Sequence, residues 1–161
     1  MRPLPILLAA LAAGGLSFAA LASPGHDHGP ETAAGKAYGQ PGDPGKPARI
    51  VRVSMREAEG RMMFVPDRIE VRKGEQVRLR LSNDGELDHE LVLATLEENL
   101  AHMKAMENAP DMAHDEANAR RLKPGGAAEI VWHFTRAGEF DFSCLIPGHR
   151  QLGMSGTLVV R

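Results

Sequence analysis

Two strand-like stretches flank a short loop in the segment Gly138-Glu-Phe-Asp-Phe-Ser-Cys144-Leu-Ile-Pro-Gly-His149-Arg-Gln-Leu-Gly-Met154-Ser-Gly-Thr-Leu-Val-Val160. The loop runs from Cys144, the only cysteine of the chain, through His149 to Met154 in a C-x4-H-x4-M pattern. Thiolate, imidazole and thioether groups all bind soft or borderline metal ions. Apolar and polar residues alternate before Cys144, so the first strand should carry the thiol inward. The segment therefore predicts a metal-ligand loop held between two strands.

The donor types in this loop indicate which metal it suits. Two imidazole nitrogens, one thiolate and a weak axial thioether define a type 1 copper site. The loop holds a single imidazole, and His89, at the start of the apolar run Leu91-Val-Leu-Ala94, is the candidate for the second. Zinc also binds Cys and His, but a Met ligand and a lone Cys disfavour it. We therefore predict a single copper ion as the cofactor.

The region from residue 49 to the C-terminus has the period-two alternation of short strands. We expect strands over 49–55, 68–72, 76–82, 89–94, 128–135, 139–144 and 156–161. Between them, Thr95 and Glu98 have the spacing of a helix capping box, and apolar residues then recur at helical spacing as far as Met106. A second short helical piece is expected at about 113–121. These patterns predict an all-β fold, a β-sandwich with a helical insertion around 95–121.

The first 48 residues differ in composition from the rest of the chain. Residues 1–22 combine Arg2 with an uncharged apolar run and an Ala20-Leu-Ala22 site, which is the form of a secretory signal peptide rather than of an uncleaved membrane anchor. Residues 23–48 are rich in Pro and Gly, which predicts a flexible tail. We thus expect a periplasmic protein with one domain, 49–161, and no membrane span after signal removal.

Charge and cysteine content narrow the classes of partner and site. The chain has 19 basic and 21 acidic residues and a net charge of −2, which argues against a nucleic-acid partner. A single cysteine in an exported protein forms no internal disulfide, so a ligand role accounts best for Cys144 and its neighbours. A redox partner protein would suit such a site, and we expect a monomer.

The strands and the loop together resemble the cupredoxins, the small blue-copper proteins that include plastocyanin, azurin, rusticyanin and auracyanin. The resemblance is carried by Phe64-Val-Pro66, Ile69-Glu-Val-Arg-Lys-Gly-Glu75, Val77-Arg-Leu-Arg-Leu81, His89-Glu-Leu91, Gly138-Glu-Phe-Asp-Phe-Ser-Cys144, Pro147-Gly-His149 and Gly153-Met-Ser-Gly-Thr-Leu-Val-Val160. It covers nearly all of 49–161. The four-residue gaps in the ligand loop look most like rusticyanin and auracyanin, and the insertion looks like periplasmic copper-tolerance cupredoxins.

This resemblance implies a Greek-key sandwich and a role for each ligand. It makes His89, Cys144 and His149 the equatorial ligands and Met154 the axial one. The chain departs from the family at Glu90, where many members have an Asn that braces the Cys loop. The residues Leu145, Ile146, Pro147, Leu152 and Gly153 are candidates for an apolar surface around His149 where a redox partner docks, and the alternative is that they close the end of the sandwich.

Two roles follow, one-electron transfer and copper tolerance, and the sequence leaves both open. Further His and Met side chains offer secondary metal sites, namely His102, Met106, Met112 and His114 in the insertion and His26 and His28 in the tail. If these side chains bind copper, the chain would act as a copper scavenger or chaperone. The alternative is that they pack in the core or lie in solvent. A copper oxidase or reductase needs further paired histidines, so we expect that this protein is not an enzyme. The alternative is a protein that donates electrons to such an enzyme.

Overall fold

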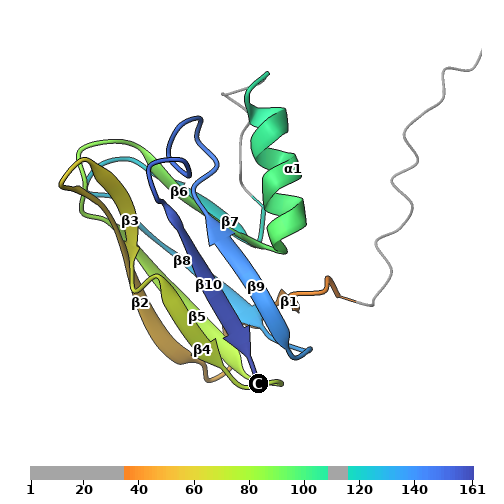
Figure 1. The fold of residues 1–161 in the computed structure, drawn as a ribbon. Coiled ribbons are helices and arrows are strands. Elements are labelled where there is room, and N and C mark those ends of the chain that lie inside the picture. The colour runs from red at the N-terminus through yellow and green to blue at the C-terminus, as the bar shows by residue number, and fades with distance from the viewer. Residues whose placement is uncertain (1–34, 109–115) are drawn as a thin grey trace, which may run out of the picture. The chain divides into compact units, whose positions relative to one another are not determined.

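The structure is a computed structural model that describes residues 35–108 and 116–161, which form two five-stranded sheets (Figure 1). The first sheet contains, in spatial order, β1 (Gln40–Pro41), β8 (Ala127–His133), β5 (Gln76–Asn83), β2 (Arg49–Ala58) and β3 (Arg61–Val65). The second contains β4 (Arg68–Val71), β10 (Ser155–Val160), β9 (Gly138–Ser143), β6 (His89–Ala94) and β7 (Ala119–Leu122). Helix α1 (Leu96–Met106) follows β6. The predicted all-β sandwich with a helical insertion is confirmed.

Each sheet contains one parallel pair, β2 with β5 in the first and β4 with β10 in the second, and the other pairs are antiparallel. The register of β9 and β10 bears directly on the predicted ligand loop. Ser143, at the end of β9, lies opposite Ser155, at the start of β10. Both ends of the loop 144–154 are therefore anchored in the same sheet.

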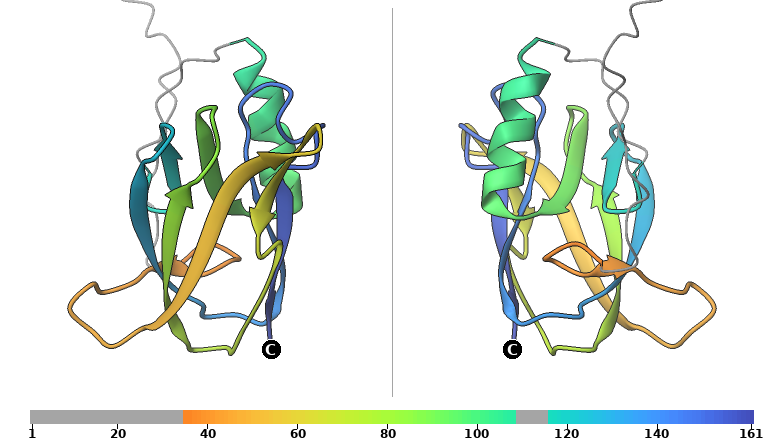
Figure 2. Two further views of the ribbon diagram at one scale, coloured as in Figure 1. Left: turned by 90° about the vertical axis from the view of Figure 1, so that its left-hand side faces the viewer. Right: turned by 90° about the vertical axis from the view of Figure 1, so that its right-hand side faces the viewer.

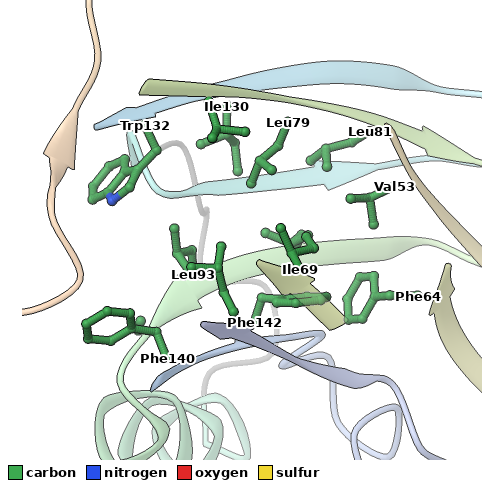
Figure 3. Close-up of a cluster of buried hydrophobic side chains, with 14 of the residues drawn as sticks. Val53, Phe64, Ile69, Leu79, Leu81, Leu93, Ile130, Trp132, Phe140 and Phe142 are labelled. Carbon is green, nitrogen blue, oxygen red and sulfur yellow. The ribbon is translucent and has the colours of Figure 1, made fainter. Parts of the chain in front are cut away.

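The core lies between the two sheets, where the inward side chains of alternating strands meet (Figure 3). Leu79, Leu81, Ile130 and Trp132 of the first sheet are at most 2 % exposed. Phe142 of the second sheet meets Phe64 edge to face, with ring centroids 5.2 Å apart. Burying a large apolar side chain contributes about 1.5–3 kcal/mol, so these layers supply most of the stabilisation of the sandwich.

The predicted flexible tail, 23–48, is wrong for its described part, which is residues 35–48. Tyr38 is 1 % exposed and stacks on Trp132 at a centroid distance of 5.7 Å. The Trp132 indole N–H also donates to the Tyr38 carbonyl oxygen at 2.7 Å, and β1 pairs with β8. The Tyr38 ring, the Tyr38 carbonyl oxygen and the pairing of β1 thus tie the segment to the domain, although its Pro and Gly content suggested otherwise.

The helical insertion differs from its prediction at its C-terminal side. The capping box is present, since Thr95 Oγ1 accepts the Glu98 backbone N–H while the Glu98 carboxylate accepts the Thr95 N–H. Residues 119–122, however, form β7 and not a second helical piece, because they pair with β6 at the edge of the second sheet. In both views of Figure 2, α1 lies beside the loop 144–154.

The signal peptide predicted for residues 1–22 lies outside the described residues, as do residues 23–34 and 109–115. Among the residues that are described, no helix has the length and apolar character needed to cross a membrane.

Candidate metal centre

Three side chains of types that can bind metals meet between the start of β6 and the loop 144–154. The Nδ1 atoms of His89 and His149 lie 3.3 Å apart, and Cys144 Sγ lies 3.4 Å from His149 Nδ1. The ligand atoms of the three residues all lie within 4.8 Å of one another. The structure thus brings together His89, from one strand, and two residues of the loop that the sequence singled out.

The distances fit one small ion. Two nitrogens that each lie about 2.0 Å from a first-row ion are about 3.3 Å apart at a tetrahedral angle, which matches the 3.3 Å between the two histidines. Burial raises the pKa of the Cys144 thiol to about 12. A thiol in such surroundings loses its proton when a cation binds beside it. An ion that takes two imidazoles and a thiolate, as copper does, fits this donor set.

The surroundings of His149 shift its pKa in the direction that suits a metal ligand. Burial, followed by the neighbouring His89, lowers the pKa of His149 below its ordinary value. The neutral imidazole is therefore favoured, and it is this form that offers a lone pair to a metal ion.

The fourth predicted ligand, Met154, is fully buried at the end of the loop. Its backbone N–H donates to the His149 carbonyl oxygen at 3.1 Å, and its carbonyl oxygen accepts the Cys144 N–H at 3.1 Å. Met154 is thus joined through the backbone to both other residues of the loop. It also belongs to the same apolar cluster as Cys144 and Phe142, so the side chain lies in an apolar environment.

Glu57, which no sequence pattern singled out, orients the His89 ring. Its Oε1 lies 2.8 Å from His89 Nε2, the nitrogen on the far side of the ring from His149. Partial burial acts to raise the pKa of Glu57, but the backbone N–H groups of Glu86 and Leu87 outweigh it and hold the pKa below its ordinary value. The carboxylate is therefore charged at neutral pH and fixes the ring orientation that aims Nδ1 at the cluster.

Glu90 occupies the position where the sequence departs from the cupredoxin pattern. Its Oε1 accepts the backbone N–H of Leu145 at 2.9 Å, so it holds the residue that follows Cys144. The side chain is fully buried, Oε2 has no hydrogen-bond partner among the described residues, and burial raises the pKa of this carboxyl group. A carboxyl oxygen thus braces the Cys loop at this position.

The surroundings of His149 are partly open to solvent. His149 is half-buried, whereas His89 is fully buried. Leu152, at 46 % exposure, and the exposed Pro147 lie in the same loop. Leu145, which was expected on this surface, is instead fully buried against α1, because it packs with Met106 in a second apolar cluster.

Of the residues expected at secondary metal sites, the structure describes His102 and Met106, which lie four positions apart on α1. Met106 is fully buried in the apolar cluster with Leu145, and His102 is half-buried on the same helix. Met112, His114, His26 and His28 lie outside the described residues.

The polar side chains that surround the loop have no local signal in the sequence. Alternation along β9 predicts Asp141 and Ser143 as outward-facing strand residues, which they are, but α1 covers that face of the sheet and buries both. Glu57 lies 32 positions before His89, so only the fold brings the two together.

Comparison with known proteins agrees with this geometry. The model of the family "Copper binding proteins, plastocyanin/azurin family" matches residues 51–161. The chain is 45% identical to the copper-resistant cuproprotein CopI of Rubrivivax gelatinosus, over 100% of this chain and 97% of that protein. It is 33% identical to CopI of Pseudomonas aeruginosa, over 100% and 99%. Among solved structures, auracyanin B is similar at a TM-score of 0.60 and 26% identity, over 72% of this chain and 91% of that one.

Proposed function

Because the chain belongs to the plastocyanin/azurin family of copper-binding proteins, we propose that it is a periplasmic copper-resistance protein with one type 1 copper site. The ligands in this proposal are His89, Cys144, His149 and Met154. The role in resistance is supported by two relatives, both named copper-resistant cuproproteins, that the chain matches over its whole length.

One observation carries the ligand set, the convergence of two imidazole Nδ1 atoms and one thiol sulfur within 4.8 Å. Copper, when bound, supplies one-electron exchange between Cu(I) and Cu(II), and a site intermediate between their preferred geometries favours that exchange. The protein supplies the rest. Glu57 orients His89, Glu90 holds the backbone after Cys144, and Met154 is a buried side chain at the end of the same loop.

Reconstitution of the apo-protein with Cu(II), followed by visible and electron-paramagnetic spectra, tests the ligand set. We expect an intense thiolate-to-copper band that is absent in Cys144→Ala. Met154→Leu is the matched variant, because it keeps the volume of a buried side chain and removes only the thioether. It should retain the band and change the axial character of the spectrum. A Cys144→Ala protein that kept the band would disprove the assignment.

A test of the resistance role uses a copper-sensitive bacterial strain. Export of the wild-type chain should raise the copper concentration that stops growth, and Cys144→Ala should not. Equal protection by both proteins would show that resistance does not depend on this site.

Electron transfer is the second candidate, and the partial exposure of His149 favours it. Among the four proposed ligands, His149 alone is not fully buried, and the exposed Leu152 lies near it in the loop. An apolar surface beside a ligand edge suits a docking redox partner. Leu152→Asp should slow electron exchange with a soluble c-type cytochrome and leave the copper spectrum unchanged. An unchanged exchange rate would argue against this face.

We further propose export through a signal peptide at residues 1–22, on the sequence pattern of that segment. N-terminal sequencing of the exported protein tests the cleavage site.

We also propose a non-enzymatic role. The described residues contain a single group of three clustered His and Cys ligands, and catalysis by a copper oxidase would require additional copper sites. Oxygen consumption by the copper-loaded protein with Cu(I) or an organic reductant would contradict the non-enzymatic role.

A further inference from the structure

A buried carboxylate joins the helical insertion to the ligand loop. Asp141 lies on β9 with its side chain on the outer face of the second sheet, under α1, and is 8 % exposed. Its Oδ1 accepts hydrogen bonds from Asn99 Nδ2 of α1 at 2.7 Å and from Ser143 Oγ at 2.6 Å. Arg150, in the loop, donates to both carboxylate oxygens at 3.0–3.1 Å. Three separate segments thus converge on one carboxylate.

The loop end of this network is next to a proposed ligand. Arg150 directly follows His149, and its guanidinium group forms the planar, two-pronged contact with Asp141 that fixes both distance and orientation. Arg150 also donates to Ser143 Oγ, one residue before Cys144. Several charge-assisted hydrogen bonds therefore restrain the residue next to His149.

The helix end of the network is equally fixed. Asn99 is fully buried, and its Nδ2 also donates to the Val92 carbonyl oxygen of β6 at 3.1 Å. Two further contacts link α1 to the loop. Gln151 Nε2 lies 3.9 Å from Met103 Sδ, and Met106 packs against Leu145. The helix therefore contacts Leu145, which follows Cys144, and Gln151 in the second half of the loop. It is linked to Arg150, which follows His149, through Asp141.

We propose that Asp141 is a positioning residue of the metal centre and that α1 acts through it to keep His149 in place before and after the metal binds. This inference rests on the ligand set of the proposed function. A loop held in its binding geometry needs no ordering when the ion arrives, and it resists the distortion through which the ion leaves. The helical insertion is thereby a structural support of the site.

The test uses copper-loaded protein and three variants that cut the network at different points. Arg150→Lys keeps the positive charge but loses the two-pronged contact. Asn99→Ala removes the hydrogen bond from α1 to Asp141, and Asp141→Asn removes the negative charge of the carboxylate that the other groups contact. Changes to groups that orient metal ligands commonly weaken metal binding by 10–100-fold. We therefore expect about tenfold faster copper release to an excess of chelator, with an altered electron-paramagnetic spectrum.

A matched control lies on the opposite sheet. Arg78 donates to Glu129 at 2.6 Å, so Arg78→Lys makes the same substitution in an ion pair remote from the loop. It should leave the spectrum and the release rate unchanged. Should Asp141→Asn fail to fold, Arg150→Lys and Asn99→Ala decide the question.

The possible outcomes separate the two proposals. A wild-type protein without a thiolate-to-copper band would disprove the ligand set, and this inference with it. A normal wild-type band, with variants that match wild type in spectrum and release rate, would overturn this inference alone. The inference also fails if the variants lower only the stability of the apo-protein, since the network would then support the fold and not the ligands.

Discussion

Glu57 Oε1 lies 2.8 Å from His89 Nε2, on the side of the imidazole ring opposite to Nδ1, which faces His149. The carboxylate itself is held by the backbone N–H groups of Glu86 and Leu87. A carboxylate in this position selects the tautomer with the proton on Nε2, so that the lone pair of Nδ1 is free for a metal ion. The end of β2 thus contributes a side chain to the candidate centre.

Glu57→Ala should weaken copper binding by about 10–100-fold, because His89 loses the partner that sets its tautomer and orientation. Competition with a chelator of known affinity measures the change. Glu86→Gln is the matched control, since it removes a nearby exposed charge but keeps the backbone N–H that binds Glu57. Wild-type affinity in Glu57→Ala would show that the contact has no role in binding.

Glu90→Ala should destabilise the apo-protein by about 1–3 kcal/mol, because the buried Leu145 N–H loses its acceptor. Glu90→Gln keeps an oxygen acceptor at the same place and should recover most of this loss. Urea unfolding of the two apo-proteins measures the difference. Equal stabilities would mean that this hydrogen bond does not hold the loop.

The features that could be predicted from the sequence are those with a local signal. Alternation in 76–82 marks a strand with one buried face, and the Thr95–Glu98 spacing marks a helix start. The ligand loop is also local, because Cys144, His149 and Met154 fall within one connection between two strands. Each of these patterns depends on residues a few positions apart, which is the range that sequence periodicity reports.

The features that could not be predicted depend on partners far apart in the chain. Tyr38 is buried because it stacks on Trp132, 94 positions later, and its own neighbourhood of Gly and Pro has no strand pattern. Residues 119–122 become a strand because the edge of β6 is available for pairing. Likewise, Asp141 has the alternation of a solvent-facing residue, and only the position of α1 makes it a buried one.

Tyr38→Ala should lower the free energy of unfolding by about 3–5 kcal/mol, the usual cost of removing a buried aromatic ring. Tyr38→Phe keeps the ring that stacks on Trp132 and loses the hydroxyl, which has a hydrogen bond with Lys36 and a long, 3.4 Å contact with Asn118. It should therefore lose much less stability than Tyr38→Ala. Chemical denaturation distinguishes the two variants. A Tyr38→Ala protein as stable as wild type would show that residues 35–41 do not stabilise the domain.

The ion pair of Glu75 and Arg49 should make stability depend on acid pH. The hydrogen bond from Arg49 is the main cause that lowers the pKa of Glu75, and the Arg72 backbone N–H adds to it against partial burial. A carboxyl group whose pKa is lower in the folded state stabilises the fold above its unfolded pKa. That stabilisation is lost as the pH falls through the folded pKa.

Glu75→Gln should therefore be less stable than wild type at pH 7 by about 1 kcal/mol, after allowance for solvent screening. The difference should shrink as the pH falls below about 4.5, the ordinary pKa of a glutamate side chain, and vanish once Glu75 is protonated in both states. Urea unfolding at a series of pH values measures it. Arg49→Gln should flatten the same pH profile, because it removes the main cause of the lowered pKa. If the Glu75→Gln difference instead persisted unchanged into acid, the contribution of Glu75 would come from packing or neutral hydrogen bonds and not from its charge.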